Sequence, residues 1–190
     1  MKPDWKSFWH RKGTEDTTDL LMLDGYENTG VTPTVLAEHI QDIQDTLGID
    51  ENSTVLEVGC GAGLMAQFFN CDYTGVDYSE TLLEKHRSIL GNDVSLAEAN
   101  DLPFENNAFD YVITIGVFQY FPDENYVNNA ISEMQRVAKK AIFIGDLPTH
   151  YPRGGVGGLT FSKEDFHEWD ITPSCYSNSM FNVYKIWGVP

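Results

Sequence analysis

The stretch Thr54-Val55-Leu56-Glu57-Val58-Gly59-Cys60-Gly61-Ala62-Gly63 decides how this chain folds. Its first half is mostly apolar and β-branched, which predicts a short strand at residues 54–58. Its second half has a glycine at every second position, and glycine lets a backbone turn sharply and approach a ligand closely. The apolar residues 64–69 then predict a helix whose N-terminal amides point back toward the turn. The stretch therefore predicts a strand, a glycine turn and a helix that either bind a ligand or only pack together.

Strands and helices alternate on both sides of this turn. Helical spacing of apolar residues predicts helices that begin after Thr32 and Ser79 and end before Gly48 and Gly91. The predicted strands are residues 54–58, 73–77, 94–97, 111–115 and 141–144, with a terminal hairpin at 174–179 and 181–186, and the predicted helices are residues 33–47, 64–69, 80–90, 127–137 and 163–169. This alternation predicts a parallel sheet with helices on both of its faces.

Length and composition indicate one soluble domain that avoids polyanions. The 190 residues favour a single domain, in which an N-terminal arm (1–31) precedes the core (32–146) and a substrate-side loop with a terminal hairpin (147–190). The formal net charge of -17 disfavours nucleic acid and anionic membranes as partners. The three cysteines show no paired or metal-ligand spacing, so no metal is expected. The first residues lack the apolar run of a secretory signal, and we expect a cytoplasmic location.

Asp77 ends the second predicted strand and points to a nucleoside ligand. A carboxylate at this position can accept hydrogen bonds from both hydroxyls of a ribose. A nicotinamide dinucleotide fits less well, because its turn needs a third glycine at position 64, where this chain has Leu64. Glu57 would also face the pyrophosphate of a dinucleotide unfavourably. A cationic nucleoside without phosphate suits this acidic turn better.

Four motifs in this order resemble the class I S-adenosylmethionine-dependent methyltransferases over residues 50–146. They are Glu57-x-Gly59-x-Gly61-x-Gly63, Gly75-Val76-Asp77, Leu102-Pro103-Phe104 and Phe109-Asp110-Tyr111-Val112. The resemblance implies an α/β fold, with a Rossmann-like, doubly wound, mostly parallel sheet of about seven strands, an antiparallel last strand and helices on both faces. It also implies S-adenosyl-L-methionine as the cofactor and S-adenosyl-L-homocysteine as the product. The methyl group would pass by in-line displacement to an O or N atom of a small-molecule or sugar-like acceptor.

The resemblance also assigns cofactor-binding roles. The glycine turn would lie against the methionine and ribose parts, Glu57 would hold the methionine ammonium, and Asp77 would hold the ribose. Tyr78 would pack on the adenine, and Glu98 would face its amino group. Apart from the resemblance, the N-terminal aromatic residues Trp5, Phe8 and Trp9 either cover the cofactor or substrate or pack on the helix that follows. The expected cofactor-binding residues are Trp9, Glu57, Gly59, Cys60, Gly61, Gly63, Asp77, Tyr78, Glu98, Ala99, Asn100, Gly116 and Gln119.

The residues for catalysis depart from the family pattern. Small-molecule relatives often carry a histidine after the fourth strand, whereas this chain has Gln119-Tyr120-Phe121. His150 and Tyr151, just beyond the fifth strand, are the remaining candidates for a base, and Tyr120 is a third catalytic candidate. Two alternatives stay open: a binding module for S-adenosylmethionine without catalysis, and transfer of another group from a modified cofactor.

Overall fold

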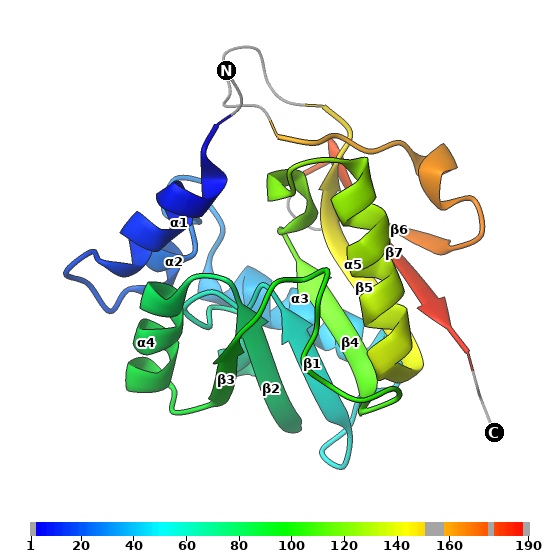
Figure 1. Ribbon diagram of the computed structural model, residues 1–190, viewed down its shortest axis with the longest axis horizontal. Coiled ribbons are helices and arrows are strands. Elements are labelled where there is room, and N and C mark those ends of the chain that lie inside the picture. The colour runs from blue at the N-terminus through cyan, green and yellow to red at the C-terminus, as the bar shows by residue number, and fades with distance from the viewer. Residues whose placement is uncertain (1–2, 151–157, 175–176, 188–190) are drawn as a thin grey trace.

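A seven-stranded sheet forms the centre of the computed structural model, which describes residues 3–150, 158–174 and 177–187. The strand order is β3-β2-β1-β4-β5-β7-β6 (Figure 1). The strands are β1 (Thr54–Val58), β2 (Asp72–Asp77), β3 (Asp93–Leu96), β4 (Phe109–Ile115), β5 (Ala138–Pro148), β6 (Asp170–Pro173) and β7 (Met180–Ile186). Strands β1 to β5 pair in parallel, and β7 is antiparallel to both of its neighbours. The predicted mostly parallel sheet with an antiparallel last strand is confirmed.

Helices cover both faces of this sheet, as predicted. They are α1 (Trp5–Gly13), α2 (Leu20–Leu23), α3 (Pro33–Leu47), α4 (Glu80–Ile89) and α5 (Glu124–Val137). Helix α3 begins where the Thr32 side chain accepts the Val35 amide, and it ends at Gly48, which has a φ of 76°. Helix α5 begins in the same way, with the Asp123 side chain accepting the Tyr126 amide. These caps satisfy amides that have no partner within the helix, which is why the helices start at these residues.

The alternation of side chains along the strands decides which helix packs on which face. Leu56 of β1 and Ile142 of β5 lie in one core cluster with Met134 of α5. Val55, one residue earlier on β1, lies in a second cluster with Ile40 of α3. Successive residues of a strand point to opposite faces, so α5 and α3 cover opposite sides of the sheet (Figure 1). The core is therefore layered as helix, sheet and helix.

The glycine turn is not followed by the predicted helix at 64–69. The segment holds only a 3-10 turn, η1 (Ala66–Phe68), before β2 begins. The apolar side chains that suggested a helix are instead packed from a short turn: Leu64 and Met65 are buried in the core cluster of α3, and Phe68 and Phe69 pack against it.

Two predictions near the C-terminus are also wrong in their boundaries. The helix expected at 163–169 is a single 3-10 turn, η3 (Lys163–Phe166), although Ser162 and Asp165 form a capping box at its start. The strand expected at 174–179 is instead β6, at Asp170–Pro173, which pairs with β7. Pro173 cannot donate to a sheet, and it is tolerated because β6 is an edge strand. The predicted terminal hairpin is thus present with its first strand four residues earlier.

The N-terminal arm lies against α4, next to the strands' carboxyl ends (Figure 1). Gly13 of α1 is so close to α4 that a Cβ there would lie 2.4 Å from the Thr81 backbone. Leu23 of α2 is buried with Leu82 of α4 and Ala62 of the glycine turn. The arm is therefore part of the folded structure and lies beside the carboxyl ends of the strands.

Among the described residues, no helix is both long and apolar enough to cross a membrane.

Candidate functional site

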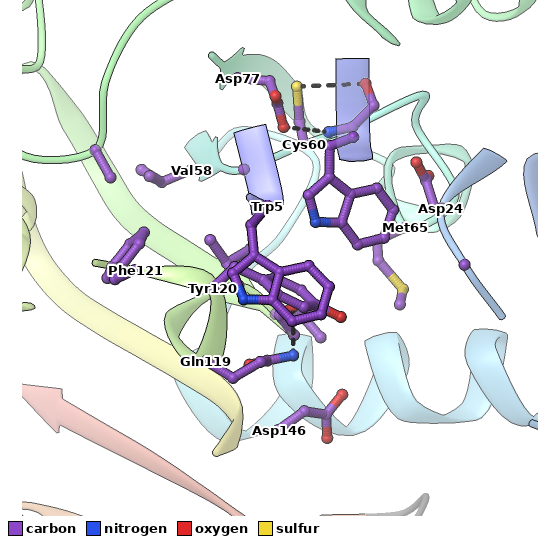
Figure 2. A pocket seen from close by; sticks show the side chains of 18 of the residues that line it. Trp5, Asp24, Val58, Cys60, Met65, Asp77, Gln119, Tyr120, Phe121 and Asp146 are labelled. Atoms are coloured by element: carbon purple, nitrogen blue, oxygen red, sulfur yellow. Dashed lines mark hydrogen bonds between the residues drawn. The ribbon is translucent and has the colours of Figure 1, made fainter. Parts of the chain in front are cut away.

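A cavity of about 590 Å³ opens at the carboxyl ends of β1, β2, β4 and β5. Ligands of open α/β sheets bind at this edge, in the crevice where the connections that leave two neighbouring strands turn to opposite faces of the sheet. Its lining combines aromatic rings with carboxyl groups, and α1 contributes Trp5 and Trp9 to its wall (Figure 2). Most of the residues predicted to bind the cofactor line this cavity: Trp9, Glu57, Gly59, Cys60, Gly61, Asp77, Tyr78, Glu98, Ala99, Gly116 and Gln119.

The glycine turn bends as sharply as the sequence predicted. The close approach that requires glycine is made in part by other protein groups. Gly59, Gly61 and Gly63 have φ values of 79°, 51° and 100°, in the left-handed region that favours glycine. A Cβ on Gly61 would lie 2.4 Å from Oδ1 of Asp24, and one on Gly59 would lie 2.5 Å from the Val117 side chain. The turn is therefore glycine-rich because protein groups pack against it. Gly63 itself does not line the cavity.

Asp24, between α2 and α3, fastens the arm to this turn. Its carboxylate accepts the amides of Ala62 and Leu64, both at 2.8 Å. Burial raises the pKa of Asp24 to about 7. The first amide of the predicted helix, that of Leu64, is therefore bonded to a side chain of the arm. Sequence reasoning missed this residue, since an Asp-Gly pair after an apolar run is an ordinary turn signal.

Asp77 lies at the end of β2, in the position predicted for a ribose-binding carboxylate. Its Oδ2 accepts the Gly61 amide at 3.0 Å and its Oδ1 accepts the Ser79 amide at 2.8 Å (Figure 2 draws the first of these bonds). Burial raises the pKa of Asp77 to about 6. A carboxylate has about four acceptor positions, so each oxygen can still accept one ligand hydroxyl. The two backbone bonds hold the carboxylate in one orientation at the cavity wall.

Glu57, at the inner end of β1, brings a second carboxyl group into the cavity. It is 2% exposed, and its Oε2 accepts a hydrogen bond of 2.5 Å from the Tyr73 hydroxyl. Burial, together with the nearby charges of Asp24 and Asp77, raises the pKa of Glu57 to about 8. Buried carboxyl groups without a counter-charge favour a positively charged ligand, which would stabilise their ionised forms.

The residues predicted to surround an adenine are tied to α1. Glu98 pairs with Lys6 and accepts the Tyr126 hydroxyl at 2.7 Å. The Tyr78 hydroxyl donates to the carbonyl of Trp5 at 3.2 Å, and the Lys6 ammonium lies 5.5 Å from the Tyr78 ring centre. Ala99 lines the cavity, whereas Asn100, also predicted for this region, does not. Helix α1 therefore covers this end of the cavity.

The end of β4 supplies an aromatic wall and a buried amide. The ring of Tyr120 lies 4.8 Å from that of Trp5 and 5.2 Å from that of Trp9, between centres. Gln119 donates from Nε2 to the Gly116 carbonyl at 2.7 Å. Burial raises the pKa of Tyr120, so its hydroxyl stays protonated at neutral pH. Tyr120 therefore forms part of the wall, and its catalytic role stays a prediction.

The end of β5 carries a residue that the predicted site did not include. Asp146 is buried, lines the cavity and accepts the Ser174 hydroxyl on Oδ1 at 2.6 Å. His150, the predicted base, is exposed at the cavity, with Nδ1 3.0 Å from the hydroxyl of Thr149. Tyr151 lies outside the described residues. The signal for Asp146 was present in the sequence, as an acidic residue directly after an apolar strand.

Comparisons with known proteins agree with this geometry. Residues 56–143 match a family model described as a methyltransferase domain. The chain is 36% identical over 86 residues to a probable tRNA methyltransferase 9B of Bos taurus, covering 45% of this chain and 19% of that protein. It is 35% identical over 121 residues to a demethylmenaquinone methyltransferase of Staphylococcus aureus, covering 58% of this chain and 48% of that protein. The chain thus spans half or less of the length of these relatives.

A solved structure with the same fold supports the strand order. The phosphoethanolamine N-methyltransferase 1 of Haemonchus contortus, in complex with phosphoethanolamine and S-adenosylhomocysteine, superposes with a TM-score of 0.72. The alignment covers 96% of this chain and 48% of that one, at 15% sequence identity. At this identity the likeness concerns the fold alone.

Proposed function

We propose that this chain, which carries a class I S-adenosylmethionine-dependent methyltransferase domain, binds S-adenosylmethionine and transfers its methyl group to a small molecule. The observation that carries the proposal is the carboxylate of Asp77, fixed at the end of β2 by the amides of Gly61 and Ser79. This carboxylate faces a cavity in which Glu57 is also buried without a positive neighbour among the described residues. A ligand with ribose hydroxyls and a positive charge matches both groups.

The residues of the cavity fit the parts of this cofactor in order along the sheet. Asp77 would bind the ribose, and Tyr78, Glu98 and Ala99 would surround the adenine beneath α1. Glu57 would face the methionine ammonium, and Gln119 would lie near the sulfonium end. When bound, the cofactor supplies an electrophilic methyl group. The chain's own residues would orient the acceptor and exclude water. In-line transfer of a methyl group depends mainly on this alignment and on a dry site.

The acceptor we propose is a small molecule that enters between the aromatic wall and the end of β5. Trp5 and Trp9 of helix α1 line the cavity and pack against Tyr120 to form this aromatic wall (Figure 2 labels Trp5 and Tyr120). An RNA acceptor, as in the tRNA methyltransferase relative, is disfavoured by the net charge of -17, because a phosphate backbone would be repelled.

The proposal is tested by calorimetric titration of the purified chain with S-adenosylmethionine, S-adenosylhomocysteine and the dinucleotide NAD. We expect both sulfur nucleosides to bind and NAD not to bind. Mass spectrometry of any ligand that copurifies identifies a modified cofactor directly. Binding of S-adenosylmethionine with no methyl transfer to any tested acceptor would favour the binding module, and absence of binding would refute the proposal.

A further inference from the structure

Two buried hydrogen-bond acceptors at one end of the cavity have no partner within the described part of the chain. They are Oδ2 of Asp146 and Oε1 of Gln119, whose residues are 3% and 8% exposed. Both residues line the cavity, and Figure 2 shows their side chains on the same side of it. A buried polar atom without a partner is costly unless a ligand or water supplies one. Since both atoms are acceptors, the missing partner is a hydrogen-bond donor.

The backbone holds Asp146 in an unusual conformation that fixes its direction. Its φ of 60° lies in the left-handed region, which non-glycine residues rarely adopt, and the pairing of β5 with β7 shifts register between Ile144 and Leu147. The Asp146 amide donates to Oδ1 of Asn182 at 3.0 Å, and its own Oδ1 accepts the Ser174 hydroxyl. Such backbone strain is found mostly at functional sites, where surrounding contacts maintain it. These contacts leave Oδ2 as the atom available to a ligand.

The strand order places Asp146 on the far side of the cofactor site from Asp77. The strands run β2, β1, β4, β5, and the proposed cofactor lies over the first three. Neighbouring strands are about 4.8 Å apart, so three spacings put the end of β5 about 14 Å from the end of β2. Asp146 therefore lies beyond the methionine end of the proposed cofactor, where an acceptor must approach.

The charges around the cavity decide what kind of acceptor fits there. Among the described lining residues, the basic side chains are Lys6 and His150, and Lys6 is already paired with Glu98. An acceptor that carried a carboxylate or phosphate would meet Asp146 with no dedicated counter-charge beside it. A cation is favoured by the Asp146 carboxylate, because a positive charge beside it would stabilise its ionised form.

We propose that Asp146 is the acceptor-binding residue and that the acceptor is an amine, which Oδ2 of Asp146 and Oε1 of Gln119 bind through its N–H groups. This inference rests on the proposed function and specifies its substrate class. The amine arrives as an ammonium ion, Oδ2 takes one of its protons, and the nitrogen keeps the electron pair of the broken N–H bond. The nitrogen is then neutral and nucleophilic, and the proton resides on the Asp146 carboxyl. Burial raises the pKa of Asp146 to about 7, which suits a base that works near neutral pH.

The test compares matched amines and alcohols on the S-adenosylhomocysteine complex of the whole chain. Cyclohexylamine is paired with cyclohexanol, and benzylamine with benzyl alcohol, with dissociation constants measured by calorimetry. The variants are Asp146→Asn and a control, Asp93→Asn, at the exposed start of β3. Asparagine tolerates the left-handed backbone and can still accept the Ser174 hydroxyl, so the variant is expected to fold.

We expect the wild-type chain and Asp93→Asn to bind at least one amine about tenfold tighter than its alcohol, an ordinary gain for one charge-assisted contact. Asp146→Asn loses this preference but binds S-adenosylhomocysteine within about twofold of the wild type. In the wild type, the ratio of the alcohol's dissociation constant to that of the amine also grows from about pH 6 to about pH 8, because the carboxyl group ionises. In Asp146→Asn this ratio does not change with pH. Equal binding of amines and alcohols by the wild type, or a preference that survives in Asp146→Asn, overturns the amine site while leaving the proposed function intact. Failure to bind S-adenosylhomocysteine would instead refute the proposed function.

Discussion

The carboxylate of Asp24 accepts the amide of Ala62 at 2.8 Å, although 38 positions separate the two residues in the sequence. The same carboxylate accepts the Leu64 amide, so one side chain of the N-terminal arm satisfies two donors of the glycine turn. The covering arm and the floor of the cavity are therefore one hydrogen-bonded unit. This link makes the stability of the turn depend on a residue outside the four motifs that carry the family resemblance.

Replacing Asp24 by alanine should destabilise the chain. The substitution leaves two buried amides without partners, and we expect the free energy of unfolding to fall by about 2–4 kcal/mol. Urea denaturation measures this change. Asp16→Ala is the matched control, because Asp16 is exposed in the same arm, and its effect should stay within about 0.5 kcal/mol. Equal effects of the two substitutions would show that the Asp24 contact contributes little.

Two glycines that both have a left-handed backbone should differ in how much an alanine substitution destabilises the chain. Gly61 and Gly91 have φ values of 51° and 73°, but only at Gly61 would a Cβ meet another group, Asp24. We expect Gly91→Ala to cost about 1–2 kcal/mol for the left-handed backbone. Gly61→Ala should cost about 1–3 kcal/mol more because of the collision. Chemical denaturation of both variants measures the difference, and equal costs would argue against the close approach of Asp24 to the turn.

Asp77→Asn should weaken cofactor binding. The amide cannot accept ribose hydroxyls on both of its terminal atoms, so the affinity for S-adenosylhomocysteine should fall by about 1–3 kcal/mol. Calorimetry measures this loss directly. Asp72→Asn, at the exposed start of the same strand, is the control and should bind as the wild type does. Undiminished binding by Asp77→Asn would remove Asp77 from the proposed site.

The stability of the ligand-free chain should fall as the pH rises from about 6.5 to about 8.5. Burial raises the folded-state pKa of Glu57 to about 8 and those of Asp24 and Asp146 to about 7, above their ordinary values. The folded chain therefore binds more protons than the unfolded chain in this range, and each lost proton leaves a buried charge. The midpoint of thermal unfolding should decrease across the range, and Glu57→Gln should flatten its upper part. A midpoint that rises with pH would contradict these assignments.

The sheet and the position of Asp77 could be predicted from sequence because their signals are local. The β-branched run at residues 54–58, the alternating glycines after it and a polar residue at the end of each apolar strand all depend on nearest neighbours. The mostly parallel sheet of about seven strands with an antiparallel last strand follows from the resemblance, and the antiparallel β7 confirms it. Helix α3 was equally clear, since its first and last residues carry recognisable caps.

The parts that escaped prediction depend on contacts between distant segments or on chain geometry. Asp24 acts on the turn across 38 positions, and nothing in its local sequence separates it from an ordinary turn residue. The apolar residues of 64–69 pack into the core cluster of α3 without forming a helix, so their spacing alone did not determine the backbone conformation. Asp146 carried a local signal, as an acidic residue after an apolar run, but the direction of its carboxyl group depends on its left-handed backbone and on the distant Ser174.

The left-handed backbone at Asp146 also limits what natural variation can place there. Glycine adopts this conformation without strain, and asparagine and aspartate adopt it at a lower cost than most other residues do. Of these three, only aspartate carries a charge. A homologue that kept the bulge of β5 but had asparagine or glycine at this position would lack the carboxylate that selects an amine. The residue at this one position therefore serves as a marker by which related sequences with this backbone can be sorted according to acceptor chemistry.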